Sequence, residues 1–168
     1  MKQLKTLLLA TALCIGTVSF SNAQGKMAHI NTQDLITAMP EMKTAQKELE
    51  TLSKKFQTDI QAAVTEFQTT LKQYEAEAAT KTEEENAKRG QEIQEKQQRI
   101  QQFQADAQKE IQKKEVDLLQ PITEKAKAAI LKVGRAQGFE YVLDASQGVT
   151  ILADGKNLLD DVKKELGI

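Results

Sequence analysis

The sequence predicts a mostly helical α+β protein in which a long antiparallel helical hairpin projects from a small β body. Residues 41–119 contain no proline and a single glycine, and their apolar residues recur at helical spacing. Short β-prone segments lie only before and after that stretch. A helix this long and this polar cannot lie inside an ordinary globular core. We therefore expect an arm of residues 41–119 that reaches into solvent from a body formed by residues 24–40 and 120–168, which is small enough to need association of several chains.

The first half of the arm carries a continuous apolar stripe that predicts a helix from about Glu41 to Ala79. Successive members of the stripe are separated by three or four residues, in the order 3-4-3-4-4-4-3-4-3-4. The mean spacing is near 3.6 residues, which predicts helices that pair with little supercoil. The members are Met42, Ala45, Leu49, Leu52, Phe56, Ile60, Val64, Phe67, Leu71, Tyr74 and Ala78.

The second half of the arm predicts a helix over residues 83–119 with a thinner apolar stripe. Nine of the 22 residues in the range 91–112 are glutamine. Thr82 and Glu85 have the spacing of a capping box, so we place a turn near Thr80-Lys81. The two halves, each about 55 Å long, match as an antiparallel hairpin requires, and the alternative is one unbroken helix of about 119 Å. The apolar residues of the second half are Ile93, Ile100, Phe103, Ala107 and Ile111.

The predicted body combines short strands with short helices. Pro40 is expected to open the first arm helix, because proline is tolerated in a first helical turn. Pro121 is expected to end or kink the second arm helix, because it removes an intrahelical hydrogen bond. The other expected elements are a strand at 27–31, a helical turn at 35–39 capped by Thr32 or Asp34, a helix at 122–137, strands at 139–144 and 149–152, turns at 146–148 and at Asp154-Gly155, and a helix at 158–166.

Residues 1–23 have the features of a cleavable secretory signal. A positive start is followed by a short apolar run over residues 7–18, and Ser21-Asn22-Ala23 has the small-x-small pattern of a cleavage site. We expect cleavage between Ala23 and Gln24, which makes residues 24–168 a single exported mature domain. The alternative is an uncleaved membrane anchor.

The residue inventory argues against catalysis and against nucleic-acid binding. Loss of Lys2 and Lys5 with the signal leaves 21 basic and 24 acidic residues, a net charge of −3, so no basic excess favours nucleic acid. The only cysteine, Cys14, lies in the signal, and His29 is the only histidine. This inventory excludes a catalytic triad, a Cys-His pair and a histidine-rich metal site. We expect no catalytic residue, cofactor or metal, and we interpret His29 as a strand side chain in or near a subunit interface.

The order of these elements resembles the OmpH/Skp family of periplasmic chaperones. The resemblance is carried by Ala28-His29-Ile30-Asn31, by Gly138-Phe139-Glu140-Tyr141-Val142-Leu143-Asp144-Ala145 and by Asp160-Asp161-Val162-Lys163-Lys164-Glu165-Leu166. It spans the whole predicted mature chain and is specific at the first two segments. It implies a homotrimer in which strands from three chains complete the β body and three arms surround a cavity. Unfolded outer-membrane β-barrel proteins would bind in that cavity without ATP.

The same sequence features suggest how such a protein would hold its clients. The stripe of the first arm helix has few apolar partners on the second. Burial of apolar area contributes about 25 cal/mol per Å², so the seam between the two helices should be only marginally stable. We expect flexible arms with accessible apolar surface, although the sequence does not single out the client-contacting residues. The expected tip carries Glu83-Glu84-Glu85 as well as basic residues, which leaves contact with lipopolysaccharide or membrane open. The alternative function is a structural or adaptor coiled-coil protein of the cell envelope.

Overall fold

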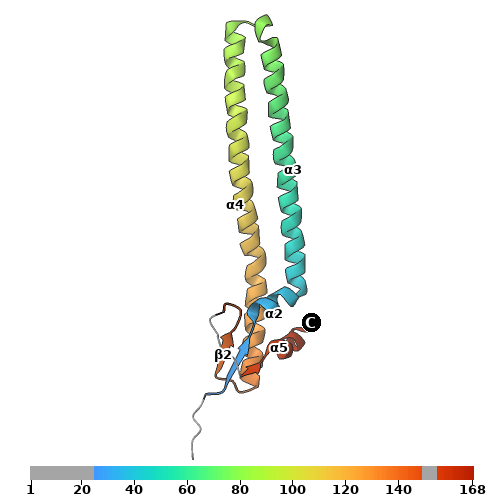
Figure 1. Cartoon of the computed structure of the whole chain (residues 1–168), viewed down its shortest axis with the longest axis vertical. Coiled ribbons are helices and arrows are strands. Elements are labelled where there is room, and N and C mark those ends of the chain that lie inside the picture. The colour runs from blue at the N-terminus through green and yellow to red at the C-terminus, as the bar shows by residue number, and fades with distance from the viewer. Residues whose placement is uncertain (1–24, 149–154) are drawn as a thin grey trace, which may run out of the picture.

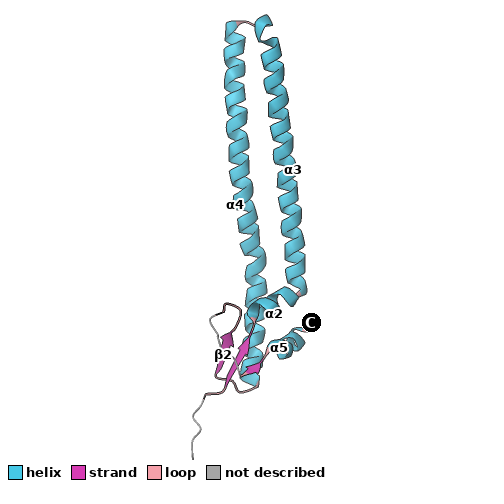
Figure 2. Ribbon diagram, viewed as in Figure 1, coloured by secondary structure: helices cyan, strands magenta, loops and turns pink. Residues whose placement is uncertain are grey.

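The computed structural model describes residues 25–148 and 155–168, and in it a long helical hairpin stands on a small body (Figure 1). Two long helices form the arm, and short strands and helices gather at its base (Figure 2). The predicted fold class, mostly helical α+β, is confirmed. The elements in chain order are β1 (Met27–Ile30), α2 (Thr32–Ala38), α3 (Pro40–Glu77), a 3₁₀ turn η1 (Ala78–Thr80), α4 (Glu83–Ala136), β2 (Tyr141–Asp144), β3 (Lys156–Asn157) and α5 (Leu159–Leu166).

Three short parallel strands form the sheet of the body, in the order β2-β1-β3. In the register of β1 and β2, Met27 lies beside Tyr141 and His29 beside Leu143. Side chains alternate between the two faces of a strand. Ala28 and Ile30 of β1 are buried against the helices, so Met27 and His29 lie on the opposite, outer face of the sheet.

The lower part of α4 supplies much of the core of the body. Its buried side chains recur at helical spacing, at Ile122, Ala126, Ala129 and Val133. Gly134 is also buried and lets β2 approach closely, because a Cβ atom there would lie 3.1 Å from Cγ2 of Val142. The remaining buried members of the core are Ala28, Ile30, Leu35, Met39, Ala45, Leu158 and Val162.

The turn at the tip of the arm confirms the predicted hairpin. After η1, Thr82 caps the start of α4. Thr82 Oγ1 accepts a hydrogen bond from the Glu85 N–H at 3.2 Å, and the Glu85 carboxylate accepts one from the Thr82 N–H at 3.0 Å. This is the predicted capping box. Asn86 Nδ2 also donates to the carbonyl of Ala78 at 2.9 Å, which ties the two sides of the turn together. The alternative of one unbroken helix is therefore wrong.

Pro121 was expected to end or kink the second arm helix, and it does not end it. α4 continues through it to Ala136, so the separate helix expected at 122–137 is the last part of α4. A proline inside a helix costs about 3 kcal/mol. Burial of a large aliphatic side chain contributes roughly 1.5–3 kcal/mol, and Ile122 and Val133 are both buried just beyond the proline. Packing of α4 into the body thus outweighs the local tendency to stop.

The cap of α2 differs from the prediction by one residue. Asn31, and not Thr32 or Asp34, precedes the helix, and Asn31 Oδ1 accepts the N–H of Asp34 at 3.1 Å. Asparagine is among the strongest residues at this position because its short side chain reaches the free N–H groups of the first turn. Pro40 does open α3, as expected.

The strands of the body also differ from the prediction. β2 begins at Tyr141 instead of Phe139, because the N–H of Phe139 donates to the carbonyl of Gly134 and closes the end of α4. β3 was not predicted, since two residues are too short to show a pattern. The strand expected at 149–152 and Asp154 of the expected turn lie outside the described residues.

Asp144 joins the end of β2 to the start of α2. Its carboxylate accepts hydrogen bonds from Thr32 Oγ1 at 2.7 Å and from the Ser146 N–H at 2.9 Å. Partial burial raises the pKa of Asp144, but the hydrogen bonds from Ser146 and Thr32 together lower it more, so the pKa lies below its usual value.

Acidification is expected to weaken the body through Asp144. A carboxylate with a lowered folded-state pKa stabilises the fold above its unfolded pKa of about 3.9. That contribution is lost as the pH falls through the lower folded pKa. Urea unfolding of the wild type and of Asp144→Asn, from about pH 7 to about pH 3, measures the effect. The difference in unfolding free energy should shrink below about pH 4, and a difference independent of pH would contradict this assignment.

Candidate functional site

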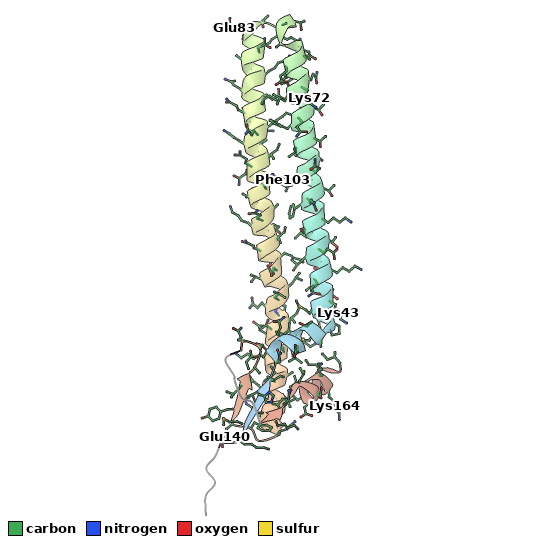
Figure 3. The ribbon with its side chains drawn as sticks, viewed as in Figure 1. Lys43, Lys72, Glu83, Phe103, Glu140 and Lys164 are labelled. Atoms are coloured by element: carbon green, nitrogen blue, oxygen red, sulfur yellow. The ribbon has the colours of Figure 1, made fainter. Side chains whose placement is uncertain are left out.

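The facing sides of α3 and α4 form an apolar seam along the arm (Figure 3). The members of the predicted α3 stripe from Met42 to Tyr74 are all buried or half-buried, and only Ala78 at the tip is exposed. The five apolar residues predicted on α4 also lie in the seam. Near its middle, the rings of Phe56 and Phe103 meet edge to face, with centroids 6.0 Å apart. The helical period thus predicted the facing sides of both helices correctly.

The seam is only partly closed. Among residues 41–119, Ala45 and Ala107 alone are buried, at 2% and 3% exposure. Every large apolar side chain of the seam keeps part of its surface open to solvent, because two helices cannot enclose side chains on all sides. The arm therefore presents a long, narrow strip of accessible apolar surface.

Polar contacts cross the seam near the tip. Arg89 pairs with Glu77 at 2.6 Å, and its guanidinium stacks 4.5 Å from the centre of the Tyr74 ring. The Tyr74 hydroxyl donates to Glu92 at 2.6 Å, and this hydrogen bond raises the pKa of Tyr74. One turn further down, Lys96 Nζ donates to Glu66 at 2.6 Å.

Two further ion pairs cross the seam near the body. Lys114 pairs with Glu48 at 3.0 Å, and Lys125 pairs with Glu41. The hydrogen bond from Lys125 lowers the pKa of the Glu41 carboxyl. Within the described chain, no hydrogen bond or ion pair joins the helices between the Glu48–Lys114 and Glu66–Lys96 pairs. Polar contacts therefore hold the arm at both ends, while its middle rests on apolar contacts alone.

A second apolar surface covers the outer face of the sheet. Met27, Tyr141 and Leu143 lie there with 52%, 60% and 45% of their surface exposed. Sequence reasoning did not identify this surface, although the alternation within β2 carries its signal: Val142 packs on the core while its two neighbours face outward. Exposed apolar patches of this kind commonly mark interfaces.

His29 lies on this same outer face, half-buried beside Leu143. Its position agrees with the interpretation of a strand side chain. In the part of the chain that the structure describes, no three His, Cys, Asp or Glu side chains come together as metal ligands do. Neither 25–148 nor 155–168 contains a helix with the length and apolar content of a membrane span. The predicted cleavage residues Ala23 and Gln24 precede the described residues.

The tip of the arm carries charges of both signs. Glu83, Glu84 and Glu85 occupy the first turn of α4, where the positive end of the helix dipole favours acidic residues. Lys88 pairs with Glu84 at 3.0 Å. The tip therefore does not form a purely basic surface.

Comparisons with known proteins agree with this architecture. The family described as "Outer membrane protein (OmpH-like)" matches residues 26–166. A solved OmpH-like protein of Caulobacter crescentus CB15, provisionally named an outer membrane chaperone, is 19% identical, with a TM-score of 0.76 over 86% of this chain and 85% of that one. No curated protein matches the chain. The structural likeness shows that the arm and body follow a known fold.

Proposed function

Because this chain belongs to the OmpH-like family of outer membrane proteins, we propose that it is an ATP-independent holdase chaperone of the periplasm. Its clients are unfolded outer-membrane β-barrel proteins, which it binds between helical arms and keeps from aggregating. The observation that carries the proposal is the half-open seam of the arm, in which every large apolar side chain retains exposed surface.

The seam suits a client without a fixed shape. Side chains such as Phe56, Ile60 and Phe103 offer apolar contacts spread along the arm instead of one shaped pocket. Many weak contacts of this kind tolerate different sequences, as promiscuous binding requires. The charged and glutamine-rich outer side of the arm keeps the complex soluble. No step in this binding needs ATP.

The proposal includes a homotrimer. The outer sheet face of Met27, Tyr141 and Leu143 supports the trimer. Removing these three neighbouring apolar side chains from water lowers the free energy of the assembly. With the sheets of three chains packed at the centre, three arms surround a common cavity, and the seams line it. Export by the signal in residues 1–23 places the mature domain, residues 24–168, in the periplasm.

Dilution of a denatured outer-membrane barrel protein into buffer tests the proposal. With a slight molar excess of mature trimer and no ATP, light scattering from client aggregates should be largely suppressed. Replacing Ile60 by serine removes part of the seam and should weaken suppression, while Gln97→Ser on the exposed side of α4 serves as the matched control. Unchanged aggregation in the presence of the wild type would disprove the holdase function and favour an adaptor role.

A further inference from the structure

We propose that the arm holds an extended segment of unfolded polypeptide along one flank of its seam only, where glutamine side chains pair with the main chain of that segment. This inference rests on the proposed function and adds to it the side of the arm that a client contacts. α4 shows a clear regularity, because each of the five apolar residues that it contributes to the seam is followed directly by a glutamine. These glutamines are Gln94, Gln101, Gln104, Gln108 and Gln112.

The two flanks of the seam are unlike on α4. With about 3.6 residues per turn, successive residues of a helix lie about 100° apart, so the residues that follow seam residues share one flank and those that precede them share the other. Four of the five preceding residues are charged, and the fifth donates a hydrogen bond to one of them at 2.9 Å. We call the two sides the glutamine flank and the charged flank. On α4 the charged flank consists of Glu92, Arg99, Gln102, Asp106 and Glu110.

α3 continues both flanks through the middle of the arm. Five successive seam residues, from Leu52 to Phe67, are each followed by an uncharged polar residue. Viewed from one end, two antiparallel helices run around their axes in opposite senses, so the following residues of α3 and of α4 lie on the same flank of the seam. The glutamine flank therefore has no charged side chain from either helix directly after these seam residues. Its members on α3 are Ser53, Gln57, Gln61, Thr65 and Gln68.

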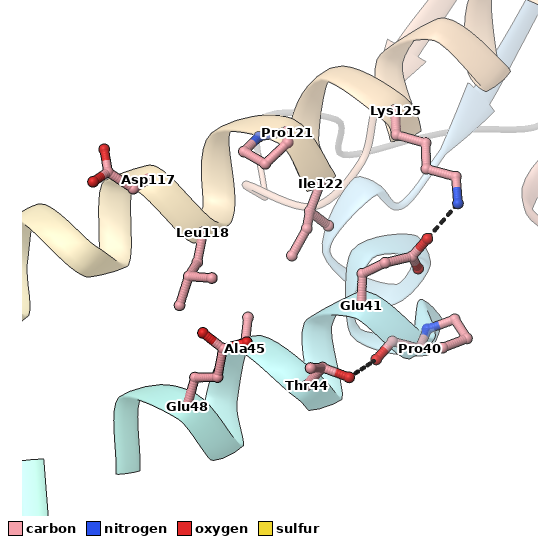
Figure 4. A pocket seen from close by; sticks show the side chains of 10 residues that line it. All are labelled: Pro40, Glu41, Thr44, Ala45, Glu48, Asp117, Leu118, Pro121, Ile122 and Lys125. Carbon is pink, nitrogen blue, oxygen red and sulfur yellow. Dashed lines mark hydrogen bonds and ion pairs between the residues drawn. The ribbon is translucent and has the colours of Figure 1, made fainter. Parts of the chain in front are cut away.

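The ion pairs that join α3 to α4 in the described chain all lie on the charged flank. In each of them, the acidic partner directly precedes a member of the α3 stripe. Figure 4 shows the pair nearest the body, in which Glu41, just before Met42, meets Lys125. The Tyr74 hydroxyl likewise crosses to Glu92. Charged side chains thus cover the seam on one flank only, and the glutamine flank stays open. The acidic partners are Glu41, Glu48, Glu66 and Glu77.

The five glutamine amides of α4 are available to a ligand. Their side chains are exposed, and none of the amides has a hydrogen-bond partner within the described residues. An amide offers both donors and an acceptor, as a peptide group does. Peptide groups that face one edge of an extended chain recur about every 7 Å. The last four glutamines lie three or four residues apart, which is about 5–6 Å along the helix, and their flexible side chains bridge the difference.

These features favour an unfolded polypeptide over other occupants. Nucleic acids and phosphate groups are bound by basic side chains, which are missing directly after these seam residues. A folded protein has already paired its peptide groups within its own secondary structure, so a row of amides offers it little. An unfolded chain has free peptide groups and free apolar side chains together. Half-buried seam residues such as Ile60 and Phe103 lie beside the polar row and can receive the apolar side chains.

Photo-crosslinking at the two neighbours of one seam residue tests the inference. Arg99 precedes Ile100 and Gln101 follows it, and the side chains of Arg99 and Gln101 are both exposed. Benzoylphenylalanine is placed at one position or the other in the full mature chain, and each protein is irradiated with a denatured outer-membrane barrel protein. Position 101 should crosslink several times more client than position 99.

Equal yields at the two positions, or a higher yield at position 99, would overturn binding on one flank, even where the wild type suppresses aggregation and the holdase function stands. Crosslinks from position 101 to a second copy of the chain, in place of the client, would show that the flank joins neighbouring arms and would overturn the proposal as well. A wild type that leaves aggregation unchanged contradicts the holdase function itself.

The double variant Gln101→Glu with Gln108→Glu tests the role of the amides. A carboxylate cannot donate a hydrogen bond, and its charge has to leave water when a client covers it. The concentration of protein that halves client aggregation should therefore rise by about fivefold or more. Each amide is one weak contact among many, so a single change has a smaller effect.

The double variant Gln91→Glu with Gln98→Glu is the matched control. It adds the same two charges at exposed positions of α4 that adjoin no seam residue, and it should suppress aggregation as the wild type does. Thermal midpoints and masses equal to those of the wild type would show that both variants are folded and assembled. If the two double variants suppress aggregation equally well, the glutamine amides do not hold the client.

Discussion

Replacing both Tyr141 and Leu143 by aspartate is expected to convert the proposed trimer to a monomer at micromolar concentration. Both side chains lie on the outer face of the sheet and are largely exposed in the single chain, so the substitutions cost the isolated fold little. In the proposed assembly the same face is covered. Burial of unpaired carboxylates there carries a penalty of several kcal/mol per charge. Light scattering coupled to size-exclusion chromatography measures the mass directly.

A charge-matched control for this experiment is available on the arm. Gln91→Asp with Gln98→Asp adds the same two negative charges at exposed positions of α4, far from the sheet. This variant should keep the mass of the wild type. A double variant of Tyr141 and Leu143 that stays trimeric would show that the outer sheet face is not the interface.

Replacing Leu158 by alanine is expected to lower the free energy of unfolding by about 2–5 kcal/mol, the usual cost of emptying a fully enclosed leucine site. Leu158 has no exposed surface and lies between β3 and α5. Its N–H donates to the carbonyl of His29 at 2.9 Å, and its carbonyl accepts the N–H of Val162. The backbone is thus fixed by β1 and α5, and the cavity cannot collapse easily. Urea unfolding at a fixed protein concentration measures the loss.

Leu71→Ala in the arm is the matched comparison. Leu71 is only half-buried in the seam, so the same truncation should cost about 1 kcal/mol. Equal costs at Leu71 and Leu158 would mean that the arm is packed as firmly as the body. That result would contradict the description of the seam as partly open.

The arm could be predicted from the sequence because its signals are local and repeated. Nine successive spacings of three or four residues, from Met42 to Tyr74, define the inner side of α3, and Thr82 with Glu85 identifies the turn within four residues of sequence. The family resemblance was also confirmed, by a family match over residues 26–166.

The remaining features depend on contacts between distant residues. The stop or kink expected at Pro121 follows from backbone chemistry alone, whereas the helix does not stop there because Ile122 and Val133 are buried in the body. The pairing of Lys96 with Glu66 depends on the register of the hairpin, which helical periodicity leaves undetermined. The open groove between the start of α3 and α4 (Figure 4) was not predicted either, since Pro40 and Pro121, which both line it, lie far apart in the sequence.

The uninterrupted course of α4 has a mechanical consequence. Its 54 residues form a helix about 80 Å long, and the last quarter of that helix is packed in the body. α3 has a shorter anchorage, because Ala45 is its one buried residue in that core and the extended backbone of Met39 separates it from α2. A sideways load on the tip therefore bends α4 about the part that is packed in the body, Ile122 to Val133. Under the proposed holdase function, the pull of a bound client would load the apolar core of the body.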